Sequence, residues 1–156
     1  MKKTIFYSWQ SDSDSKTNRN FIEECIRKAI KELNRESEYD IEHRLDKDTT
    51  DEGGTPHIAD TIFSKIAQSS FFIADISIIN PDASGRKTPN PNVLLELGYA
   101  ARAIGWNKII CIFNEDFGSY NDLPFDLRFR RPLTYSLKLK DKASVRKEVV
   151  EKLKDN

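Results

Sequence analysis

The apolar residues of this chain follow two alternating periodicities. Short runs rich in β-branched and aromatic residues predict strands, and segments with an apolar residue every three or four positions predict helices. The strand-like runs cover 4–8, 39–45, 71–76, 108–113 and 133–139, and predicted helices separate or follow them. This alternation favours an α/β fold, with a mostly parallel five-stranded sheet and helices on both faces.

The carboxyl ends of the predicted strands are the places to look for a site. Runs 71–76 and 108–113 show no polar alternation, so we expect both strands to be buried on both faces. Runs 39–45 and 133–139 are more polar and are expected at the sheet edges. Ligands of such sheets bind beyond the carboxyl ends of the strands, where the strand order reverses.

The balance of charges removes several function classes. The chain has 156 residues, with 25 Lys and Arg against 25 Asp and Glu. We expect a single domain over residues 1–156. A net charge of zero argues against a nucleic-acid polymer as partner. No apolar run approaches the roughly 20 residues that span a membrane, so no membrane contact is expected.

The cysteines and histidines predict neither disulfides nor a metal site. Two cysteines in separate apolar segments are typical of buried thiols in a reducing cytoplasm. Two His and two Cys without close spacing do not form a zinc site. If Asp46 begins a calcium loop, Asp51 and His57 stand at its sixth and twelfth positions, where such a loop needs Gly and Glu. We therefore expect no metal.

The most informative segment is 89–100. Asn90 followed by Pro91 predicts a helix start, and the helix should run to about Ile104. Glu96 lies at the edge of the apolar stripe of this helix. Partial burial would raise its pKa and its reactivity, and such a carboxylate can act as nucleophile or stabilise an oxocarbenium-like centre. The alternative is a half-exposed Glu paired with a neighbouring Lys or Arg.

Other candidates follow three predicted strands. Trp9 offers a face for stacking on a base, and Ser8 and Ser11 offer hydrogen bonds to a ribose or phosphate. Trp9 is equally typical of an aromatic that covers the core. Asp75 could orient a ligand or cap the next loop. Asp46 and Asp48 belong to an acidic, glycine-containing loop that is either a mobile cover over a pocket or a solvated connection.

Two surface features complete the candidates. Leu95, Tyr99 and Arg102 share the side of the helix opposite the apolar stripe, which suggests a contact surface for another protomer. The cluster of Arg128, Arg130 and Arg131 is typical of a salt-bridged or solvated face.

Three segments, 6–12, 46–49 and 89–100, resemble bacterial TIR domains, nearest to the TIR domain fused to bacterial STING, a cyclic-dinucleotide sensor in anti-phage defence. Segments 107–113 and 123–128 also fit, so the resemblance covers nearly the whole chain in order. It implies a flavodoxin-like sheet and cleavage of NAD+ at the nicotinamide–ribose bond, with Glu96 as the catalytic residue. NAD+ would be the substrate, and no cofactor is expected. The residues expected to bind the nucleotide are Ser8, Trp9, Ser11, Asp46, Asp48, Asp75 and Asn92.

The resemblance also implies partners and regulation. We expect a homo-oligomer or filament through TIR–TIR contacts, a fused C-terminal STING domain, a cytoplasmic location, and low activity of the isolated domain. Two alternatives stay open. One is an enzyme like the nucleoside 2-deoxyribosyltransferases, which also break an N-glycosidic bond and have a nucleophilic Glu before Leu-Gly-Tyr-Ala. The other is a TIR scaffold without catalysis.

Overall fold

A computed structural model of the chain describes residues 3–36, 41–44 and 58–156. In this part, five parallel strands form one sheet in the order β2-β1-β3-β4-β5. The strands are β1 (Lys3–Ser8), β2 (Ile41–Arg44), β3 (Phe71–Asp75), β4 (Ile109–Asn114) and β5 (Leu133–Tyr135). The main helices are α1 (Arg19–Glu36), α2 (Ile58–Gln68), α3 (Pro91–Ala103), α4 (Phe125–Arg128) and α5 (Lys142–Lys154). Short 3₁₀ turns are η1 (Trp106–Lys108), η2 (Glu115–Phe117) and η3 (Tyr120–Asp122).

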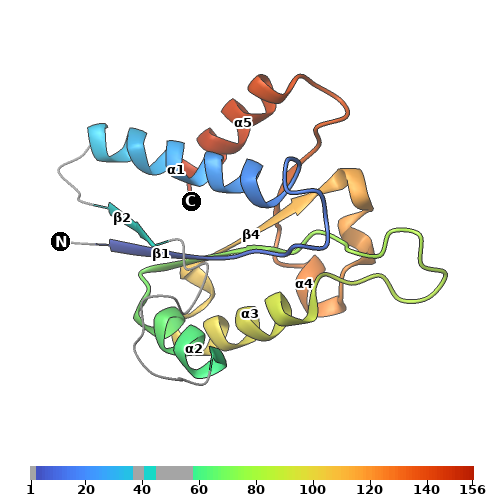
Figure 1. Ribbon diagram of the computed structural model, residues 1–156, viewed down its shortest axis with the longest axis horizontal. Helices are drawn as coiled ribbons and strands as arrows, with labels where there is room; N and C mark the ends of the chain where they lie inside the picture. Colours follow the sequence, from blue (N-terminus) through green and yellow to red (C-terminus); the bar gives the residue numbers. More distant parts are fainter. Residues whose placement is uncertain (1–2, 37–40, 45–57) are drawn as a thin grey trace.

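Helices cover both faces of this sheet, which confirms the predicted α/β fold. Helices α1 and α5 lie on one face, and α2, α3 and α4 lie on the other (Figure 1). Each face therefore has its own apolar core. Ile22, Ile26 and Val149 belong to the first core, and Phe72, Val93 and Phe113 to the second.

The expected places of the strands are confirmed, whereas the length of the edge strand β5 differs from the prediction. β3 and β4 are central, and β2 and β5 form the edges. Strand β5 ends at Tyr135, four residues earlier than expected. Beyond Tyr135, the Ser136 hydroxyl and the Leu137 amide donate to the carboxylate of Asp116, so the backbone leaves the ladder.

The strand order reverses between β1 and β3. The chain goes from β1 to β2 on one side and then crosses back to β3 on the other side of β1. At such a switch point the connections diverge and leave a crevice beyond the carboxyl ends of the strands. Ser8 and Asp75 are the last residues of these two strands. Within the described residues, no helix is long and apolar enough to cross a membrane.

Candidate active site at the carboxyl end of β1

The start of helix α3 is fixed by the side chain of Asn90. Its Oδ1 accepts a hydrogen bond from the amide of Asn92 at 2.8 Å, and Pro91 takes the first helical position. Its Nδ2 donates to Oδ2 of Asp12 at 2.7 Å. The predicted cap is confirmed, and the same residue also ties the helix to the loop after β1.

One turn further along α3, Glu96 meets Ser8. The Ser8 hydroxyl donates to Oε2 of Glu96 at 2.5 Å. Ser8 is almost fully buried at the end of β1, and Glu96 is half-buried. Among the described residues, the Glu96 carboxylate has this serine as its hydrogen-bond partner and forms no ion pair with a Lys or Arg. Glu96 therefore does not form the surface ion pair with a Lys or Arg that was the alternative interpretation of this residue.

Burial perturbs the acidity of this carboxyl group. Desolvation raises the pKa of Glu96, and the hydrogen bond from Ser8 opposes that rise because it stabilises the ionised form. A carboxylate that is partly desolvated and held by one hydroxyl is suited to interact with positive charge that develops nearby.

A cavity of about 210 Å³ opens beside this pair. Its lining includes four of the predicted binding residues together with Glu96: Ser8, Trp9, Ser11 and Asn92. A second hollow of about 560 Å³ is mainly apolar and shares Ile62, Asn92 and Glu96 with the first. Glu96 therefore lies where the two depressions meet.

Trp9 lies at the cavity with one face already occupied. The guanidinium carbon of Arg19, the first residue of α1, lies 3.5 Å from the centre of the indole ring. The indole also packs partly against the core on the α1 side. Trp9 thus combines the two roles considered for it, because it lines the cavity and covers the core. Sequence reasoning did not find Arg19, which no motif marks.

The side chain of Gln10 connects three of the segments that form the site. It is almost fully buried, its Nε2 donates to the carbonyl of Ser77 at 2.8 Å, and its Oε1 accepts from the amide of Asn90 at 3.0 Å. Both ends of its amide are used inside the protein. Gln10 therefore joins the ends of β1 and β3 to the start of α3, and this holds Ser8 and Glu96 together.

Asp75 lies in a buried polar network rather than in the lining of either hollow beside Glu96. Its carboxylate accepts from Asn18 Nδ2 and from the Ser77 amide, both at 3.0 Å. Asn114 completes the network through Asn18 Oδ1 and the Ser77 hydroxyl. Burial raises the pKa of Asp75. The bond to Ser77 matches the capping role considered for it, and the network fixes the loops after β3 and β4.

Asp46 and Asp48 lie outside the described residues. Elsewhere, in the part of the chain that the structure describes, no three His, Cys, Asp or Glu side chains are grouped closely enough to hold a metal ion.

Comparisons with known proteins place the fold. No protein-family model and no curated protein matches the chain. Among solved structures, it is similar to the TIR domains of the activated Roq1 resistosome that recognises the pathogen effector XopQ. The identity is 12%, the match covers 97% of this chain and 99% of that one, and the TM-score is 0.50. A flavodoxin-like domain from Synechococcus matches with 12% identity, coverage of 98% and 94%, and a TM-score of 0.49. The chain therefore has a fold of the TIR type.

Proposed function

We propose that this chain is an NAD+ glycohydrolase in which Glu96 is the catalytic residue. The observation that carries the proposal is the half-buried Glu96 carboxylate, bonded to Ser8 on a cavity at the switch point of the sheet. The resemblance to bacterial TIR domains supplies the substrate, and the similarity of fold to the Roq1 TIR domains is compatible with it.

The proposed reaction needs little from the protein beyond this carboxylate. The bond between nicotinamide and ribose breaks, and its electron pair leaves with the nicotinamide. Positive charge then develops at the ribose, where ionised Glu96 stabilises it. Water adds to the anomeric carbon and releases a proton, which gives ADP-ribose. Partial burial of Glu96 strengthens this attraction, because less water competes there than at a fully exposed position.

The biological setting is part of the same proposal. The domain acts as an effector in anti-phage signalling, is fused to a STING domain that senses cyclic dinucleotides, and becomes active when protomers assemble. This rests on the resemblance stated above. The Roq1 TIR domains, which share the fold, come from a resistosome.

The test compares NAD+ turnover by the parent protein and by Glu96→Gln at high protein concentration. Gln keeps the shape and accepts the Ser8 hydrogen bond but carries no charge. We expect the rate to fall by roughly 10²-fold or more. Glu151→Gln, which removes an exposed carboxylate from α5, is the matched control and should leave the rate unchanged.

Three results contradict the proposal. If Glu96→Gln cleaves NAD+ as fast as the parent, Glu96 is not catalytic. If the parent exchanges bases on deoxynucleosides and leaves NAD+ intact, the enzyme is a deoxyribosyltransferase. Assembly without loss of NAD+ would indicate a scaffold.

A further inference from the structure

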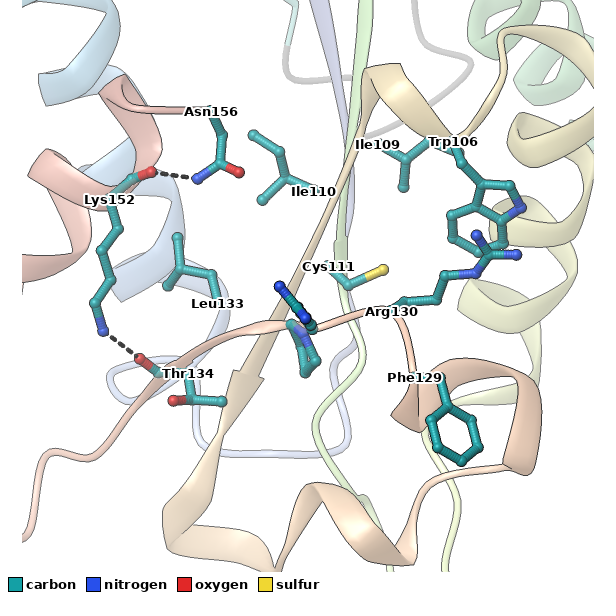
Figure 2. Close-up of a pocket in the computed structure, with 12 residues that line it drawn as sticks. Trp106, Ile109, Ile110, Cys111, Phe129, Arg130, Leu133, Thr134, Lys152 and Asn156 are labelled. Carbon is teal, nitrogen blue, oxygen red and sulfur yellow. Dashed lines mark hydrogen bonds between the residues drawn. The ribbon is translucent and has the colours of Figure 1, made fainter.

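A cavity of about 460 Å³ lies beside the edge strand β5 (Figure 2), and Glu96 is not part of its lining. Its lining includes the first residues of β4 and β5, whereas Ser8 is the last residue of β1. Because the strands are parallel, the cavity and the Ser8–Glu96 pair lie toward opposite ends of the sheet. Its volume falls in the range of small-molecule sites.

Three cationic side chains from two segments line this cavity: Arg130, Arg131 and Lys152. The Arg130 guanidinium carbon lies 3.9 Å from the centre of the Trp106 ring, and Lys152 Nζ donates to the Thr134 carbonyl at 3.2 Å (Figure 2). Within the described residues, none of the three forms a salt bridge to a carboxylate. Of the two roles that the sequence suggested for these arginines, a salt-bridged face is therefore not formed at this cavity.

The backbone at this cavity is strained. Arg131 has φ of 48°, and it is the sole non-glycine residue with positive φ in the part of the chain that the structure describes. Side chains disfavour this left-handed region, and unfavourable backbone conformations cluster at functional sites. Pro132 follows directly and limits the conformations of Arg131 further. The strained residue is itself one of the three cations.

We propose that this cavity binds a small molecule through a diphosphate group. Guanidinium groups match phosphate oxygens in pairs, and three unpaired positive charges suit a group with several negative charges. Arg130 covers one face of Trp106, so this face is not free to stack on a ring of the ligand. The cationic side chains would therefore recognise the ligand through its phosphates. The site is independent of the proposed NAD+ cleavage.

Calorimetric titration of the protein with inorganic pyrophosphate at low salt tests this site. We expect saturable binding of one pyrophosphate, weakened roughly tenfold or more in Arg131→Gln and in Lys152→Gln. Lys147→Gln, which removes an exposed charge from the same helix as Lys152, should bind like the parent. Absence of saturable binding, or equal weakening in Lys147→Gln, overturns the proposal, because it would mean non-specific attraction only.

Arg131→Gly provides a readout that a folding defect cannot imitate. Glycine adopts positive φ without steric cost, so this variant should have a higher Tm than the parent and still lose pyrophosphate binding. A variant that melts higher and binds as tightly as the parent shows that the Arg131 side chain is not a ligand of the anion, which contradicts the site.

Discussion

At the scale of single residues, burial and the Ser8 hydroxyl act in opposite directions on the acidity of Glu96. Burial raises the pKa of this carboxyl group, and the hydrogen bond from Ser8 partly opposes this rise. Protonated Glu96 has no charge with which to stabilise a cationic centre. The proposed activity should therefore be lost as the pH falls through the raised pKa of Glu96, and the acid limb of kcat/KM reports that pKa in the free enzyme.

Ser8→Ala should move this acid limb. Without the hydroxyl the pKa of Glu96 rises further, so the loss of NAD+ cleavage should begin at a higher pH than in the parent. Ser11→Ala is the control, because Ser11 lines the same cavity without a bond to Glu96. A pH profile of kcat/KM for the three proteins measures the shift, and a limb that stays in place in Ser8→Ala would contradict this role.

At the scale of secondary-structure elements, the N-terminal cap of α3 helps to fix the position of Glu96. Asn90 closes the first turn and also bonds to Asp12, so its replacement affects both the helix and its attachment. Asn90→Ala should cost about 1 kcal/mol of unfolding free energy. Because Glu96 lies in the second turn, we also expect slower NAD+ cleavage.

Asp141→Ala is the matched control for that variant. Asp141 caps α5, which has 13 residues like α3 but lies on the other face of the sheet. Both variants should melt at a lower temperature than the parent, whereas only Asn90→Ala should slow the reaction. Thermal unfolding and NAD+ turnover on the same samples separate the two effects. Equal slowing in both would mean that stability alone governs the rate.

Local patterns explain which elements could be predicted. Helix α3 combines a cap, a proline and an apolar stripe within 15 positions, so its bounds and the edge position of Glu96 follow from neighbours in sequence. The role of Gln10 depends on partners 67 and 80 positions away, and no local pattern carries that information. Likewise, the early end of β5 depends on Asp116, which belongs to another connection.

At the scale of the whole molecule, the α2–α3 side exposes apolar surface close to the site. Leu95 is 63% exposed, and the Tyr99 ring stacks on Phe63 of the same chain at 4.6 Å between centroids. The predicted contact surface for another protomer therefore rests mainly on Leu95. Its position beside Glu96 in the apolar hollow would link assembly to the reaction.

Leu95→Asp should remove the dependence of specific activity on protein concentration. We expect the parent to cleave more NAD+ per mole as its concentration rises, and the variant to stay at the low level, since a buried contact cannot accept the new charge. Leu139→Asp is the control, because Leu139 is also exposed, at 83%, but lies in the connection between β5 and α5. Identical concentration dependence in all three proteins would exclude Leu95 from the assembly.

The hydrogen bond between Ser8 and Glu96 has a consequence for synthesis of the chain. The two residues are 88 positions apart, and β3 lies between them in sequence and beside β1 in the sheet. Closing so long a loop costs chain entropy, which the pairing of β1 with β3 and the docking of α3 offset. A nascent chain that has emerged only as far as β3 thus carries Ser8 without its carboxylate. Under the proposed function, such a chain cannot cleave NAD+ while it still lacks helix α3 and its Glu96.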